Sequence, residues 1–325
     1  MGSVGELFGE RGFNDGLLAG LVGFCAVVLV YACVRRRPVT VAGVAFAVAG
    51  AAAISGFGPF EVAGPFPGRV TVGLVLLAGA GWIVRWQRPP VIFAMALMAP
   101  GALTVAYGTS LGPPMSPTWV QPLIAMATAV GAALAADFDH AQRARALGPI
   151  VLAVSVGAVY ATVPDTERAM VLVGASIVLL LASFPTPLSS LGPEGAAASV
   201  GLLLWVAAAD GRGRPGSIVG AIGALALLVV EPLVRRIVKP DRRARRPENH
   251  LATVVLVALA QGALALYAAR VAGFEDDEGR AALLLVPMVV AAVLIAPMLP
   301  PPRSRAPRRR RGPGRHAHAP QRRDR

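Results

Sequence analysis

The segment Val70–Tyr107, VTVGLVLLAGAGWIVRWQRPPVIFAMALMAPGALTVAY, shows the pattern that decides the fold class. Two long apolar runs flank a short break that contains Arg85, Arg88 and two prolines. Each run approaches the roughly 20 residues that a helix needs to cross the hydrocarbon core of a bilayer. The segment therefore predicts two consecutive membrane-spanning helices joined by a tight basic turn.

The same pattern repeats along the whole chain. Hydrophobic residues make up 55% of its 325 residues and charged residues only 15%, whereas a soluble domain carries about 25% charged residues. Apolar runs between charged or Pro/Gly-rich breaks predict eleven transmembrane helices. They cover residues 16–34, 38–57, 69–84, 90–108, 119–136, 148–163, 169–184, 195–209, 217–234, 250–269 and 281–299. We expect an all-α polytopic integral membrane protein with an extracytoplasmic segment over 1–15, a helical bundle over 16–300 and a tail over 301–325.

The distribution of basic residues predicts the orientation of this bundle. With the N-terminus outside, the cytoplasmic segments contain fourteen basic residues and the C-terminal tail adds ten, against seven on the opposite side. Cytoplasmic loops of membrane proteins are enriched in Lys and Arg, so we expect an N-out, C-in topology. Arg replaces Lys almost throughout, which is typical of GC-rich bacterial genomes and favours the cell membrane of such a bacterium.

The seventh and eighth predicted spans are the weakest part of this topology. The eighth, 195–209, is the shortest of the eleven, and the connection before it, PTPLSSLGPEG, contains no basic residue. A count of nine or ten spans is therefore an alternative. If these two segments formed a hairpin that does not cross the membrane, the other spans would keep their orientation.

Two pairs of similar segments indicate a 5+1+5 parallel internal repeat. MAPGALTVAY resembles LAQGALALY, and PGRVTVGLVLLAG resembles PGSIVGAIGALAL, each with a shift of six helices. The same small apolar residues dominate every span, so chance similarity is the alternative. Secondary transporters often contain such repeats and bind their substrates at interrupted helices in matching positions. The candidate central binding site is accordingly Pro100, Gly101, Gln261 and Gly262, with a packing kink and an interhelical hydrogen bond as the alternative roles.

Three acidic residues near the ends of spans are further candidates, because ionisable groups in membrane helices are often functional. Glu231 precedes Arg235 by four residues, the favourable order for a helical ion pair. Asp137 and Asp139 lie beside His140 where the fifth span ends. Interfacial ion pairs are the favoured interpretation for all three acids, with a functional acid at Glu231 and metal coordination by Asp137 and Asp139 as the alternatives, and we expect no bound metal.

The tail over 301–325 contains ten arginines and one aspartate among prolines and glycines. This composition predicts a disordered cytoplasmic segment that is attracted to anionic lipid headgroups. Docking of an acidic protein partner is the alternative. The tail lacks the interleaved aromatic residues of single-stranded nucleic-acid binders, so we expect no nucleic-acid binding.

The sequence contains no P-loop, dinucleotide fingerprint or catalytic motif, so we expect no cofactor, and a non-enzymatic role is favoured over an enzymatic one. The leading hypothesis is a permease-like protein for a neutral or amphipathic small solute or lipid. The alternatives are a non-catalytic scaffold subunit of a secretion or envelope-assembly complex and a membrane enzyme acting on lipid-linked substrates.

Overall fold

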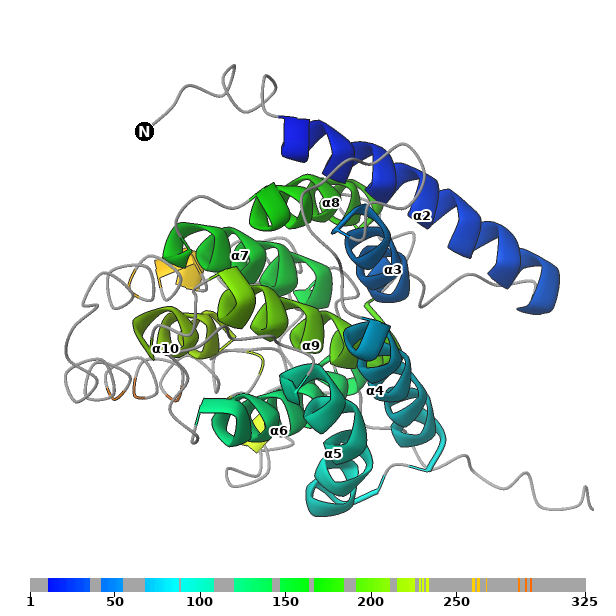
Figure 1. The fold of residues 1–325 in the computed structure, drawn as a ribbon. Coiled ribbons are helices and arrows are strands. Elements are labelled where there is room, and N and C mark those ends of the chain that lie inside the picture. Colours follow the sequence, from blue (N-terminus) through cyan, green and yellow to red (C-terminus); the bar gives the residue numbers. More distant parts are fainter. Residues whose placement is uncertain are drawn as a thin grey trace, which may run out of the picture.

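The computed structural model describes residues 11–35, 42–54, 68–87, 89–107, 120–141, 147–163, 167–183, 191–210 and 215–225, and twelve further residues between 228 and 293. The described part is all-helical (Figure 1). Its helices are α2 (Arg11–Arg35), α3 (Ala42–Ile54), α4 (Gly68–Gln87), α5 (Val91–Tyr107), α6 (Val120–Ala141), α7 (Leu147–Thr162), α8 (Glu167–Ser183), α9 (Pro193–Asp210) and α10 (Pro215–Ala224).

These helices coincide with the first nine predicted spans, including the uncertain seventh and eighth, which are α8 and α9. The tenth and eleventh spans lie outside the described residues except for a few helical positions, and the tail lies outside them entirely. By length and apolar composition, two segments are sufficient to cross a membrane, Gly12–Leu29 in α2 and Gly68–Gln87 in α4. Other helices, among them α3, α5 and α7, are apolar but shorter.

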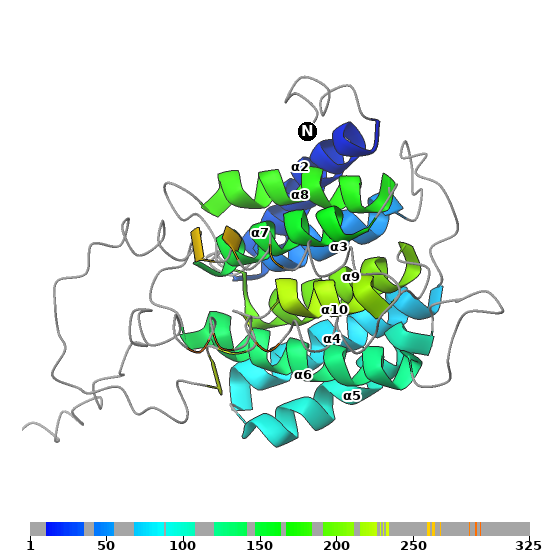
Figure 2. The same cartoon turned by 90° about the vertical axis from the view of Figure 1, so that its left-hand side faces the viewer.

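The segment that was weakest in the sequence, α9, forms the centre of the bundle. Every residue of α9 from Pro193 to Ala208 is buried, and both views place the helix between its neighbours (Figures 1 and 2). A helix that is hydrophobic on all sides belongs in the interior of a large protein or a membrane bundle. The segment predicted as the shortest span is thus an 18-residue helix in the interior of the bundle.

The start of α9 follows from its local sequence. Gly192 has a φ of 77°, a left-handed conformation that glycine adopts without steric cost. Pro193 follows at the first helical position, where its missing N–H is not needed. The backbone N–H of Ala196 donates to the carbonyl of Gly192 at 2.8 Å, and the N–H of Gly43 donates to the carbonyl of Leu191 at 3.1 Å. The second bond ties the start of α3 to the turn before α9.

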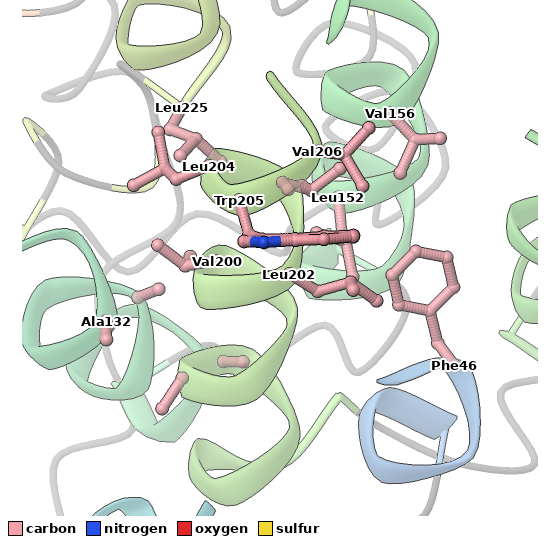
Figure 3. Packing of buried hydrophobic residues seen from close by; sticks show 14 of the residues in the cluster. Phe46, Ala132, Leu152, Val156, Val200, Leu202, Leu204, Trp205, Val206 and Leu225 are labelled. Atoms are coloured by element: carbon pink, nitrogen blue, oxygen red, sulfur yellow. The ribbon is translucent and has the colours of Figure 1, made fainter. Parts of the chain in front are cut away.

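Trp205 is the largest fully buried side chain of α9. Figure 3 shows its indole ring among Phe46, Leu152, Leu202 and Val206, which come from α3, α7 and α9 itself. A buried aromatic side chain of this size contributes more packing free energy than a smaller apolar side chain would. Trp205 thereby anchors α9 against the helices on one side of the bundle.

Close contacts between helices define the direction in which neighbours run. α2 and α8 run in the same direction, as do α3 and α9, whereas α9 runs opposite to α4 and α6. For α2 and α8, the contacts are Gly12 with Glu167 and Gly20 with Ala175, and for α3 and α9 they are Gly43 with Leu191 and Gly50 with Leu202. For α4 and α9, they are Gly81 with Glu194 and Leu74 with Gly201. For α6 and α9, they are Gly131 with Val200 and Ile124 with Ala208. Glycines allow this close approach, as in the small-residue interfaces of membrane helices.

Apart from α10, which packs on α7 and α9, the described helices form two groups on either side of α9. We call α2, α3, α7 and α8 the α2 group, and α4, α5 and α6 the α4 group. Helices within each group pack extensively on one another, and α9 packs mainly on α3, α4 and α6. Across the described helices, the two groups meet directly only at a small contact between α6 and α7 and at still weaker ones. The two groups are therefore joined chiefly through α9.

The parallel repeat predicts that α8 and α9 pack as α2 and α3 do, because these pairs would correspond. α2 and α3 pack extensively, but α8 and α9 touch at only a few residues. The described contacts thus differ between the two pairs. The remaining helices of the second proposed half lie outside the described residues.

Candidate functional site: ion pairs at both ends of the central helix

The only charged residues of α9 are Glu194 in its first turn and Asp210 at its last position. At 1.5 Å per residue they are about 24 Å apart along the helix axis. Each forms an ion pair with an arginine of a different helix. Because a charge removed from water is costly unless it is paired, these two pairs explain how the charged residues of the central helix are accommodated.

At one end, Arg85 of α4 donates from Nη1 to Oε1 of Glu194 at 2.8 Å. The Glu194 side chain is 5% exposed and the Arg85 side chain 26% exposed. One turn before Arg85, a Cβ atom added to Gly81 would lie 2.6 Å from the carbonyl oxygen of Pro193. The glycine therefore brings α4 close enough to α9 for the two charged side chains to meet.

At the other end, Arg168 of α8 donates from Nη1 to Oδ1 of Asp210 at 2.8 Å. The Asp210 side chain is 7% exposed and the Arg168 side chain 24% exposed. The guanidinium carbon of Arg168 also lies 5.5 Å from the centroid of the Trp205 ring, within the range of a cation–π interaction. Arg168 thus contacts two residues of α9.

The helix dipoles favour the first pair and oppose the second. Arg85 lies in the last turn of α4 and Glu194 in the first turn of α9, where a cation and an anion are respectively stabilised. Arg168 lies at the start of α8 and Asp210 at the end of α9, where the partial charges have the wrong sign. The two pairs have the same length, and the helix dipoles stabilise only the Arg85–Glu194 pair.

Each pair joins α9 to a different helix group. Arg85 belongs to the α4 group and Arg168 to the α2 group, at opposite ends of α9. We refer to these as the Arg85 end and the Arg168 end of the bundle. Separation of a group from α9 at one end therefore breaks one pair and leaves the other intact.

The predicted binding-site residues of α5 have different surroundings. Pro100 is exposed, and its carbonyl accepts a 2.7 Å hydrogen bond from the hydroxyl of Thr104. Gly101 is buried against α4, where an added Cβ atom would lie 2.8 Å from the carbonyl oxygen of Gly73. Gly101 thus has a helix-packing role, and the binding role of both residues stays a prediction.

The other predicted site residues are only partly described. Gln261 and Glu231 lie outside the described residues, and Gly262 is a half-buried helical residue at which an added Cβ atom would have no described heavy atom within 4 Å. Asp137 is half-buried near the end of α6, and Asp139 belongs to the same helix. Among the described residues, no three His, Cys, Asp or Glu side chains gather as a metal site would require.

The sequence contained no local signal for the two ion pairs. Arg85 and Glu194 are 109 residues apart, and Arg168 and Asp210 are 42 apart. Arg85 and Arg168 contributed only to the charge distribution between loops. Among comparisons with known proteins, the chain matches no family model, and no curated protein is significantly similar to it.

Proposed function

We propose that the chain is a multi-pass membrane protein of the permease type, which moves a neutral or amphipathic small solute or lipid across the cell membrane of a bacterium. The observation that supports transport most directly is the arrangement of two helix groups joined through one buried helix. In many transporters, one bundle rocks against another around a site near the middle of the bilayer.

The helix directions support the membrane part of this proposal. In a chain of consecutive spans, odd-numbered spans run one way and even-numbered spans the other. The parallel pairs α2 with α8 and α3 with α9 join spans of the same parity, and the antiparallel pairs α4 with α9 and α6 with α9 join spans of opposite parity. Arg85 and Glu194 also meet at one end of the bundle, as the N-out topology requires, since it assigns both residues to the cytoplasmic side.

The outer surface of α4 and α5 also fits a lipid environment. Its exposed residues are mainly large and apolar, namely Val72, Val75, Leu76, Trp82, Trp86, Ile92, Phe93, Leu97, Leu103 and Tyr107. Trp82 and Trp86 lie near the Arg85 end with ring centroids 6.0 Å apart, and Tyr107 lies at the opposite end of α5. Trp and Tyr gather at the two membrane–water interfaces, so this surface fits a lipid-facing one.

The ion pairs give the proposed transport cycle a concrete form. With both pairs formed, α9 is held to both helix groups and neither end is open. Rocking of the α4 group away from α9 at the Arg85 end breaks one pair, and rocking of the α2 group at the Arg168 end breaks the other. Access from the two sides of the membrane then alternates.

Distances between spin labels in nanodiscs test this proposal without a known substrate. Nitroxide labels at the exposed positions Leu181 and Ile92 report on the Arg85 end, in a background in which Cys25 and Cys33 are alanine. Labels at Glu167 and Tyr107 report on the Arg168 end. A variant that breaks the Arg85–Glu194 pair should lengthen the distance at the Arg85 end. A variant that breaks the Arg168–Asp210 pair should lengthen the distance at the Arg168 end.

The specific expectation is that Glu194→Gln lengthens the first distance only and Asp210→Asn the second only. Asp15→Asn is the matched control, because it removes an acid of α2 outside both pairs and should change neither distance. Narrow distances that are identical in all variants would contradict rocking and would favour the scaffold hypothesis.

A further inference from the structure

Asp210 carries a buried carboxylate oxygen that has no hydrogen-bond partner among the described residues. Its Oδ1 atom accepts the hydrogen bond from Arg168, whereas its Oδ2 atom is buried and unpaired. The buried hydroxyl groups of Thr128 and Ser199 are unpaired as well, but they are neutral. Burial costs a charged group far more free energy than a neutral one, so the carboxylate of Asp210 is the unpaired group that requires an explanation.

The position of Asp210 disfavours its negative charge. Asp210 follows the predicted span 195–209 by one residue and lies at the C-terminal end of α9, where the helix dipole is unfavourable to an anion. Burial raises the pKa of Asp210, although the charge of Arg168 and its hydrogen bond lower it. Arg168 is also shared with the ring of Trp205. A proton is small enough to reach a buried oxygen, and it removes the charge.

The other ionisable groups of the bundle leave this equilibrium to the pair itself. Within the described part of the chain, Asp210 forms an ion pair with Arg168 alone, and α3, α6 and α10 have no ionisable residue at the Arg168 end. The other helices place there Arg11 and Asp15 of α2, Arg69 of α4, Tyr107 of α5, Tyr160 of α7 and Glu167 of α8. Since arginine keeps its proton in proteins, Asp210 is the member of the pair that titrates.

The location of the pair determines the side from which a proton arrives. The predicted N-out topology assigns the Arg168 end to the extracytoplasmic side, and the Arg168 side chain is 24% exposed there. A proton that reaches Oδ2 from this side neutralises Asp210. Arg168 then keeps only neutral contacts with α9, namely the protonated carboxyl group and the ring of Trp205.

We propose that Asp210 is a proton-binding site that controls the Arg168 end: a proton from the extracytoplasmic side binds to Oδ2, breaks the ion pair with Arg168 and lets the α2 group separate from α9. The inference rests on the proposed transport function, and it adds the proton as a second ligand and extracytoplasmic acid as the signal that opens one end. Release of the proton restores the carboxylate, the ion pair and the closed end.

Infrared difference spectra of the full chain in nanodiscs test proton binding without a known substrate and without any helix motion. Lowering the pH from about 8 to about 5 should produce the C=O stretching band of a buried, protonated carboxyl group, with a midpoint above the usual aspartate value of about 3.9. The band should be absent in Asp210→Asn. It should remain in the matched control Asp15→Asn, which removes an acid of α2 at the same end.

Arg168→Gln is a second variant that tests the same site with Asp210 in place. It should shift the midpoint upward by roughly 1 pH unit or more, because loss of a nearby positive charge favours the protonated carboxyl group. A spectrum without an Asp210-dependent band over this pH range would overturn the proposal. An unchanged midpoint in folded Arg168→Gln would overturn it too, because Arg168 would then not be the partner that protonation releases.

The spin-label distances connect proton binding to opening and separate this inference from the proposed function. The same decrease in pH should lengthen the distance between labels at Glu167 and Tyr107, which should already be long at both pH values in Asp210→Asn. The distance between labels at Leu181 and Ile92 should stay constant, because the helix dipoles stabilise both charges at the Arg85 end.

Two outcomes would divide the proposals. If Asp210→Asn lengthens the distance at the Arg168 end but acid does not, the proton-binding site is wrong and the transport proposal stands. If the infrared band depends on Asp210 while neither acid nor Asp210→Asn changes a distance, proton binding is supported, and both its control of the Arg168 end and the rocking motion are refuted.

Discussion

Replacement of Gly195 by alanine tests whether α9 has the central position that the structure gives it. Gly195 faces Gly43 where α9 crosses α3, and an added Cβ atom would lie 2.5 Å from three backbone atoms of Gly43 and Val44. Cβ atoms are almost never closer than 3.0 Å to another heavy atom, and ordinary contact begins at 3.4 Å. The two helices would have to separate by about 0.9 Å to accommodate the methyl group.

α9 cannot move away from α3 freely, because α4 contacts it as well. An added Cβ atom at Gly81 of α4 would already lie within 2.6 Å of the carbonyl oxygen of Pro193. Overpacking of a core commonly costs 1–3 kcal/mol when side chains can adjust. Here the obstructing atoms belong to the backbone, so we expect Gly195→Ala to lower the free energy of unfolding by about 3 kcal/mol or more.

The assay is unfolding of the purified protein in mixed micelles with increasing denaturing detergent, compared with Gly79→Ala. Gly79 of α4 is exposed and has no heavy atom within 4 Å of its added Cβ position. Its replacement should be neutral or stabilising by up to about 1 kcal/mol, since alanine favours helix more than glycine does. If the two variants differ by less than about 0.5 kcal/mol, the backbones of α3 and α9 are not in contact and the central position of α9 is wrong.

Two further predictions concern the ion pairs and the outer surface. Removing one member of the Arg85–Glu194 pair, by Arg85→Met or Glu194→Gln, should cost about 1–3 kcal/mol of unfolding free energy. This is less than for a fully buried pair because Arg85 is partly exposed, and a double-mutant cycle should give a coupling of about 1 kcal/mol. In the same cycle for Arg168 and Asp210, each single variant should lose less unfolding free energy, because the helix dipoles oppose that pair. An equal or larger loss would contradict the effect that we assign to the helix dipoles. Val75 of α4 is 65% exposed. Val75→Arg should raise the free energy of membrane insertion by about 2.5–3.5 kcal/mol, whereas an unchanged inserted fraction would show that this surface does not face lipid.

The sequence predicted the helices well and their packing poorly. The eighth span was expected at 195–209 and α9 runs from Pro193 to Asp210, because apolar runs bounded by Gly, Pro and charge determine where a helix begins and ends. The same segment was judged the weakest because it is short. Nothing in a run of Ala, Gly and Leu indicates which neighbours surround it, since such a helix is apolar on every side.

The candidate site divides in the same way. Pro100 and Gly101 were predicted from an interrupted helix, and the structure assigns Gly101 to close packing against Gly73. The residues that the structure brings together, Arg85 with Glu194 and Arg168 with Asp210, were visible only as charges near helix ends. No spacing rule connects residues 109 positions apart.

By itself, the sequence determined the helical class of the protein and the approximate positions of its described helices, because both depend on the local free energy of apolar and breaking residues. Only the tertiary structure decided that α9 is the central helix, that the helices form two groups around it, and that each group is tied to it by one ion pair. These features depend on which surfaces meet, and small residues leave that choice to the fit of whole helices against one another.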